Sequence, residues 1–393
     1  MSRRALSITA LIAAAALALC ACSPAPPADQ AKTLKIVYQK TDSFTALDDL
    51  FKSAKAEFEA AHDGVTVELQ PIQAEESDYG TKLALALRSP STAPDVFYED
   101  TFKVRSDVDA GYLLKLDDHL AEWKDWEKFD DAAKAAGLAD DGGTYAVPLG
   151  TDTRAIWYNK KVLTAAGISL PWEPRTWQDI LDTARKIKAS DPSVVPFNMY
   201  AGKGSAEGAV MQSFYELLYG TGDELYDADA KKWVVGSDGF TASLAFLKTL
   251  YDEQLAVSPA EALDANVWKK AVGELLPQGK MGAIVEGSYA PSFWQEGGSY
   301  EWPDYGTDMG VAPFPTKDGQ APGGVSMSGG WTLAVGAGTK DPDLAFEFLA
   351  TALNQKNSLA YNIAGSNIAV REDVASDAGY QAANPFVKDV SEL

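Results

Sequence analysis

Four short segments combine aromatic rings with carboxylates, hydroxyls or a guanidinium, and such groups can bind a sugar. The segments are residues 97–100, 151–154, 286–289 and 329–331. Carboxylates and arginine form charge-assisted hydrogen bonds with hydroxyls, while aromatic faces cover the apolar side of a sugar ring. The segments therefore predict a site for a polyhydroxylated ligand.

Motifs of nucleotide-binding proteins and hydrolases are incomplete in this sequence. Phe197 stands where a Walker sequence would need its first glycine, and Asp341 stands where a dinucleotide fingerprint would need its third. Ser326 is not the serine of a nucleophile elbow, because Ser328 takes the place of the second glycine. The sequence thus offers no established motif for these activities.

The histidines and acidic residues of the sequence give little support to an enzymatic function. The two histidines, His62 and His119, are interpreted as structural, which leaves little material for a zinc site or a Ser-His-Asp triad. A glycosidase needs two carboxylates about 5 to 9.5 Å apart, but no pair stands out among the 56 acidic residues. We expect a binding protein without catalytic residues, metal or cofactor.

From residue 33 onward, short β-like runs alternate with amphipathic helical runs, which is typical of an α/β fold. Residues 34–38 and 65–69 are predicted strands on either side of a helix at 46–62, whose apolar residues recur at helical spacing. Prolines and glycines concentrate between residues 287 and 330, so this stretch is predicted to form loops and crossings between lobes.

The first 22 residues resemble the signal peptide of a bacterial lipoprotein. Arg3 and Arg4 precede an apolar run at 6–19 that falls short of the roughly 18 to 20 residues of a membrane span. Cys22 follows small Ala21, as a lipobox requires. We expect residues 1–21 to be a signal peptide and residues 22–32 to be the lipid anchor and tether. The protein would then be extracytoplasmic, anchored to the cell membrane in the periplasm or on an outer face.

The formal charge of −22 limits the kinds of partner that the protein can bind. Such a charge repels nucleic acid and anionic headgroups, and no basic stretch offsets it. Removal of the signal peptide would leave no cysteine pair for a disulfide, so stability must come from a large core. An apolar content of 46% is consistent with one. We expect no nucleic-acid partner.

Several segments resemble the extracellular solute-binding proteins of ABC sugar importers, the maltose-binding-like group. Residues 93–116, which contain APDVF and GYLLKL, resemble that family's PDV…D…G.L..L stretch. Residues 145–160 (YAVPLGTDTRAIWYNK) are similar to its Y.vP…lyYNK segment. Residues 309–315 and 329–333 resemble its return crossing and the strand that follows. The matches occur in family order and extend over almost the whole body.

The resemblance implies a two-lobed, periplasmic-binding-protein-like α/β fold with a ligand cleft between the lobes and multiple interlobe crossings. We expect the first lobe at residues 33–149 plus 311–345 and the second at 150–310 plus 346–393. A monomer is expected, which would capture a mono-, di- or oligosaccharide and present it to the permease subunits of an ABC transporter.

The candidate ligand-binding residues combine the segments above with predicted loops. Asp42 and Ser43 are included because they follow the first strand, where loops of an α/β protein reach a ligand. The residues expected to bind polar groups are Asp42, Ser43, Glu99, Asp100, Asp152, Arg154, Glu286 and Ser288. Those expected to stack on the ligand or to border it are Tyr200, Trp268, Tyr289, Gly330 and Trp331.

Two other functions remain open at this point. A glycerophosphodiester or other polar metabolite could replace the sugar, with Arg154 as the partner of an anion. A surface glycosidase or lyase would change the class of protein altogether.

Overall fold

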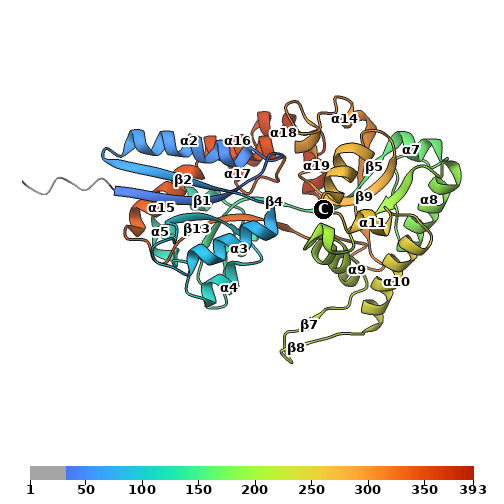
Figure 1. The fold of residues 1–393 in the computed structure, drawn as a ribbon, viewed down its shortest axis with the longest axis horizontal. Coiled ribbons are helices and arrows are strands. Elements are labelled where there is room, and N and C mark those ends of the chain that lie inside the picture. Colours follow the sequence, from blue (N-terminus) through green and yellow to red (C-terminus); the bar gives the residue numbers. More distant parts are fainter. Residues whose placement is uncertain (1–31) are drawn as a thin grey trace, which may run out of the picture.

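The computed structural model describes residues 32–393. The predicted signal peptide, the lipidation site Cys22 and nearly all of the tether lie outside these residues. Lys32, expected to end the tether, is already the first residue of strand β1. Two α/β lobes lie side by side and are joined by extended chain (Figure 1). The predicted fold class is therefore confirmed.

The first lobe is built on a five-stranded sheet in the order β2-β1-β3-β13-β4. Strand β1 (Lys32–Lys40) is parallel to β2 (Val65–Gln73) and to β3 (Val96–Asp100). Strand β13 (Gly329–Val335) is antiparallel to both β3 and β4 (Ala146–Asp152). A late segment of the chain therefore lies between two early strands.

Helices cover both sides of this sheet. Helix α2 (Ala46–Ala61) packs with α15 (Pro342–Ala352) and α16 (Gln355–Gly365), while α3 (Glu76–Leu87) and α4 (Val104–Asp109) lie on the opposite side (Figure 1). The helix predicted at residues 46–62 is confirmed. Its buried apolar residues recur at i, i+3 and i+4 spacing: Leu47, Leu50, Phe51, Ala54 and Phe58.

The second lobe contains a four-stranded sheet in the order β10-β5-β9-β6. Strand β5 (Arg154–Asn159) is antiparallel to β9 (Met281–Gly287) and β10 (Met309–Ala312), and β9 is parallel to β6 (Val195–Asn198). Because helices cover both faces, these strands are apolar at consecutive positions. Thus Ile156 belongs to one hydrophobic core and its neighbour Trp157 to another.

Short helices complete both lobes, and one hairpin projects from the second (Figure 1). The hairpin consists of β7 (Tyr226–Asp227) and β8 (Lys232–Trp233). The remaining first-lobe helices are α5 (Asp117–Glu122), α6 (Asp131–Lys134), α17 (Glu372–Ala375) and α18 (Ala378–Ala383). Those of the second lobe are α7 (Lys160–Ala165), α8 (Trp177–Ser190), α9 (Tyr215–Gly220), α10 (Asp238–Asp252), α11 (Pro259–Ala262), α12 (Val267–Lys270), α13 (Pro291–Trp294), α14 (Tyr305–Asp308) and α19 (Val387–Ser391). None of the helices in residues 32–393 has the length and apolar character that crossing a bilayer requires.

The chain passes between the lobes at three places within residues 32–393. It leaves the first lobe between β4 and β5, and it returns between β12 (Gly324–Val325) and β13. It passes once more before α19, because Phe386 and Val390 belong to a second-lobe core.

The lobe boundaries differ from the expected ones at two places. Residues 311–325 belong with the second lobe, because β10 pairs with β5 and the side chain of Phe314 lies in a second-lobe core. Residues 346–383 belong with the first lobe, because α15 continues past residue 345, Tyr361 and Val370 lie in the first-lobe core, and α17 and α18 pack with α16. The stretch predicted as loops at 287–330 contributes the sheet strand β10 as well as turns.

Replacing Trp157 tests the two-sided packing of β5. Its side chain is fully buried and lies edge-on to Trp294, with ring centroids 5.6 Å apart. Trp157→Ala should lower the free energy of unfolding by about 3 to 5 kcal/mol. Urea denaturation followed by circular dichroism would measure the loss.

The matched control is Trp233→Ala on the projecting hairpin, where the side chain is 67% exposed. This change should cost no more than about 0.5 kcal/mol. Equal losses for the two variants would contradict the packing described for β5.

Candidate functional site

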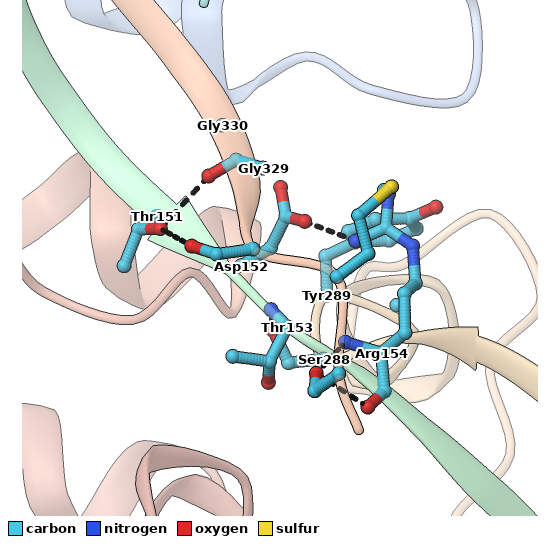
Figure 2. A network of polar contacts seen from close by, with 12 residues as sticks. Thr151, Asp152, Thr153, Arg154, Ser288, Tyr289, Gly329 and Gly330 are labelled. Atoms are coloured by element: carbon cyan, nitrogen blue, oxygen red, sulfur yellow. Dashed lines mark hydrogen bonds and ion pairs between the residues drawn. The ribbon is translucent and has the colours of Figure 1, made fainter. Parts of the chain in front are cut away.

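A buried ion pair occupies the first crossing between the lobes. Asp152 ends β4 and Arg154 begins β5, so their side chains, two residues apart in extended chain, point to the same side. The Arg154 guanidinium donates to the Asp152 carboxylate (Figure 2). Only 7% of Asp152 and 6% of Arg154 is exposed. Both residues were predicted site residues, and the structure brings them together.

The buried Nε–H of Arg154 is an unused hydrogen-bond donor within residues 32–393. Burial opposes its charged form, but Asp152 and then Tyr289 outweigh this effect, and the pKa of the guanidinium is raised. The guanidinium lies 5.4 Å from the centre of the Tyr289 ring, in a cation–π arrangement. Its Nε–H has no partner among the described residues. A buried donor of this kind is costly unless a ligand or water supplies an acceptor.

The carboxylate of Glu286, at the end of β9, is held by two tyrosines. The Tyr200 hydroxyl donates to Oε2, and the Tyr289 hydroxyl donates to Oε1 at 2.9 Å. The backbone N–H of Gly287 also donates to Oε1, at 2.8 Å. Burial, followed by the charge of Glu286, raises the pKa of both tyrosines, so their hydroxyls stay protonated donors. These three predicted residues form one group beside Arg154.

Trp331 offers an aromatic face next to Asp100. In the register of β13 and β3 these two residues are partners, and the Trp331 ring stacks on that of Tyr98 at 4.3 Å. Gly330 lies at φ +132°, and a Cβ there would be 2.7 Å from the Gly150 carbonyl oxygen. Gly330 therefore permits the close approach of β13 to β4 that places Trp331.

Three carboxylates from both lobes converge near this ring. Glu76 at the start of α3, Asp100 at the end of β3 and Glu207 of the second lobe each place an oxygen within 4.8 Å of the others. Burial and then Glu207 raise the pKa of Glu76 to about 9. Burial also raises the pKa of Asp100 to about 6. The pKa of Glu76 is thus raised both by burial and by its hydrogen bond with Glu207.

Glu216 is a further buried acid. It lies on α9 and is 1% exposed, and its Oε1 accepts from the backbone N–H of Met327 in the returning crossing. Its Oε2 has no partner within residues 32–393. Burial raises the pKa of Glu216 to about 8, although the charge of Arg154 acts in the opposite direction. Glu216 thus adds an unused oxygen close to the Arg154 charge.

The lobes also contact each other directly beside these groups. Lys269 on α12 forms an ion pair with Glu75 at 3.2 Å. The Ser299 hydroxyl donates to the carbonyl oxygen of Ser43 at 2.9 Å. Ser43, a predicted ligand residue, therefore bridges the lobes through its backbone.

Three of the predicted site residues lie apart from the polar group around Arg154, and a fourth, Ser288, holds the backbone next to it. Asp42 is exposed and accepts from Gln73. Glu99 alternates with Asp100 along β3 and lies beside Asp107 of α4. Trp268 packs against Phe293. Ser288 is buried and accepts from the backbone N–H of Thr153, so it fixes the crossing (Figure 2).

Three residues at the site were missed by reasoning from the sequence. Glu76 follows β2, and the rule that selected Asp42 after β1 would have selected it too. Glu216 precedes two leucines in a helix, and an acid next to an apolar run is a recognisable signal. Glu207 belongs to no segment singled out in the sequence, and nothing in the local sequence marks it.

Two surface hollows lie away from these groups. One of about 350 Å³ is bordered by α12, and another of about 400 Å³ lies beside the β7–β8 hairpin. Neither is lined by Asp152, Arg154 or Trp331. The junction between the lobes remains the place where buried polar and aromatic groups converge.

The fold and this junction define a two-lobed α/β protein with a polar site where the lobes meet. A family model described as bacterial extracellular solute-binding protein matches residues 40–358. The chain belongs to this family.

Relatives and solved structures agree with this membership. The chain is 29% identical over 314 residues to the diacetylchitobiose binding protein DasA of Streptomyces coelicolor, covering 77% of this chain and 67% of that protein. It is 24% identical to the maltodextrin-binding protein MdxE of Bacillus subtilis, covering 90% and 77%. The GacH receptor of Streptomyces glaucescens, solved unliganded and with acarbose, superposes with a TM-score of 0.74 at 25% identity, covering 92% of this chain and 86% of that one.

Replacing Asp152 tests the buried ion pair. Asp152→Asn keeps the shape of the side chain but leaves the Arg154 charge without its partner in a buried position. The free energy of unfolding should fall by about 3 kcal/mol or more. The comparison is Asp252→Asn, which breaks an exposed pair with Lys248 and should cost less than about 1 kcal/mol. Similar losses of unfolding free energy in denaturant titrations of both variants would contradict the burial described for the ion pair of Asp152 and Arg154.

The buried acids predict how stability depends on pH. Burial, then Asp107 and Asp100, raises the pKa of Glu99 to about 9. An unfolded glutamate has a pKa near 4.3, so between these values the folded chain binds the extra proton. Stability must therefore fall as pH rises from about 5 to 9. Urea titrations across this range should show the decline, with a smaller slope for Glu99→Gln. A slope that is unchanged in Glu99→Gln would contradict this assignment.

Proposed function

We propose that this protein captures a carbohydrate between its lobes and presents it to the permease subunits of an ABC importer. One observation carries the proposal: Arg154, with its unused donor, lies between the lobes among buried carboxylates and an aromatic face. Carboxylates accept hydrogen bonds from sugar hydroxyls, the free Nε–H of Arg154 donates one, and Trp331 covers an apolar ring face. The relatives named for diacetylchitobiose and maltodextrin support a sugar as ligand.

Capture would proceed through closure of the two lobes. The second lobe contributes Arg154 and Glu286, and the first contributes Asp100 and Trp331, so a ligand that contacts all of them stabilises one relative placement of the lobes. The direct contacts of Lys269 with Glu75 and of Ser299 with Ser43 would then belong to that placement. The permease subunits would recognise it.

Anchoring and assembly complete the proposal. The lipobox-like sequence before Cys22 supports lipid attachment at that residue, with the body outside the cytoplasm. We propose a monomer as the assembly. The relatives in Streptococcus pneumoniae are described as solute-binding lipoproteins, which agrees with this arrangement.

Neither alternative function gains support from the site. A glycerophosphodiester would need a free cation, but Arg154 is paired with Asp152 and surrounded by further acids. A surface glycosidase or lyase would not account for the match to a family described as bacterial extracellular solute-binding protein. The sugar-binding function is therefore the one that we retain.

A panel of mono- and disaccharides tests this function. A sugar at 100 times its dissociation constant should stabilise the protein by about 2.7 kcal/mol, which thermal melting detects. Trp331→Ala should then lower the affinity for that sugar by about tenfold, because the stacking of the Trp331 ring on the sugar is lost. Trp233→Ala, on the projecting hairpin, is the control and should bind normally. A panel without any shift in melting temperature would argue strongly against sugar capture.

A further inference from the structure

The ion pair between Asp152 and Arg154 joins residues that belong to different sheets. Asp152 pairs with Gly329 in the first-lobe sheet, and Arg154 pairs with Gly287 in the second-lobe sheet. Only Thr153 separates the two charged residues in the chain (Figure 2). Because each sheet holds one of them, a rotation of one lobe against the other must be absorbed between them. Such a rotation moves the carboxylate relative to the guanidinium.

Hydrogen bonds of Thr153 show where this crossing can bend. The Thr153 N–H donates to the Ser288 hydroxyl at 3.2 Å, and its carbonyl oxygen accepts from the Ser288 N–H at 2.9 Å. The Thr153 hydroxyl donates to the Val390 carbonyl oxygen at 3.2 Å. Ser288 and Val390 belong to the second lobe, so Thr153 moves with that lobe. The backbone between Asp152 and Thr153 is therefore the point at which the crossing bends.

The returning crossing is held in the same way. The Ser326 hydroxyl accepts from the Arg154 N–H at 2.9 Å and donates to the Arg154 carbonyl oxygen at 2.8 Å, which fixes Ser326 to the second lobe. The Gly329 carbonyl oxygen accepts from the Thr151 hydroxyl at 2.8 Å, on the first-lobe side. Residues 327–328 lie between these two fixed points. Both crossings therefore bend next to the buried ion pair.

Glu216 places a second carboxylate beside the returning crossing. Its Oε1 accepts from the N–H of Met327, the residue that follows Ser326. Its Oε2 has no partner within residues 32–393, and neither has the Nε–H of Arg154. Glu216 is 1% exposed and Arg154 is 6% exposed, so protein encloses both. An unused acceptor and an unused donor are thus held at consecutive residues of one crossing.

An opening rotation would separate Arg154 from Asp152 but not from Glu216. Asp152 ends a strand of the first-lobe sheet, whereas Glu216 lies on α9 of the same lobe as β5. A buried guanidinium is costly without a carboxylate partner. On its own lobe, the oxygens of Glu286 are already held by two tyrosines, while Glu216 has one oxygen to offer.

We propose that Arg154 has two positions, paired with Asp152 when the lobes are closed and with Glu216 when they are open. The inference rests on the lobe closure in the proposed function and names the residues that set its equilibrium. Each pairing stabilises one placement of the lobes. The direct contact of Ser299 with Ser43 at 2.9 Å indicates that this structure has the closed placement.

Two nearly isosteric variants should act in opposite directions on affinity. The probes are diacetylchitobiose and maltotriose, titrated by calorimetry. Asp152→Asn removes the partner of the closed form, so sugar binding should weaken by about fivefold or more. Glu216→Gln keeps an oxygen for the Met327 N–H but offers no acceptor to Arg154 Nε. The open form is then destabilised, and binding should tighten by about fivefold. Loss of a direct contact with the sugar would weaken binding instead.

The sugar-free protein provides an independent measurement. Small-angle X-ray scattering reports the separation of the lobes through the radius of gyration. This radius should be smaller in Glu216→Gln than in the unmodified protein, and it should not be smaller in Asp152→Asn. The control is Glu224→Gln, which neutralises an exposed second-lobe acid and should change neither affinity nor radius.

The outcomes separate this inference from sugar capture. Weaker sugar binding in Glu216→Gln, or an affinity and a radius equal to those of the unmodified protein, would overturn it. An equal shift in Glu224→Gln would also overturn it, because the effect would then come from net charge. If Asp152→Asn does not fold, Glu216→Gln decides alone. If neither probe binds, that result counts against sugar capture, and the scattering of the sugar-free variants still decides between the two positions of Arg154.

Discussion

The ion pair between Asp152 and Arg154 is the interaction on which the site depends. It lies in the chain that joins the lobes, so the same two residues end one sheet, begin the other and present charge between them. Burial makes each partner costly without the other. The Tyr289 ring lies beside the guanidinium, and the hydroxyls of Tyr289 and Tyr200 hold the carboxylate of Glu286.

The sequence predicted the elements better than their assignment to lobes. The helix at 46–62 was evident because its apolar residues recur at one helical period. The local sequence also contains the capping box of Thr176 and Asp179 with which α8 begins. The lobe boundaries went wrong where pairing is decided by distant partners. Strand β10 joins the second lobe only because β5 lies there, and no local pattern around residue 310 records that.

The site was predicted in part for a similar reason. Asp152, Arg154, Glu286, Tyr289 and Trp331 lie in segments whose composition stands out, and the structure brings them together. Glu99 and Asp100 looked equivalent in the sequence, but the alternation of a strand sends them to opposite sides. Glu207 could not be found, because its role comes from facing Glu76 across the lobes, which only the tertiary structure creates.

The position of β13 has a consequence for the order in which the chain can fold. This strand lies between β3 and β4, yet about 180 residues separate β4 from it in the sequence. While the intervening segment is being synthesised, β3 and β4 each keep an unpaired edge, which is a template for wrong pairing. The second lobe, nearly continuous from β5 to β12, can form its sheet first. The N-terminal lobe is then the last to be completed, and any export machinery must hold it open until β13 arrives.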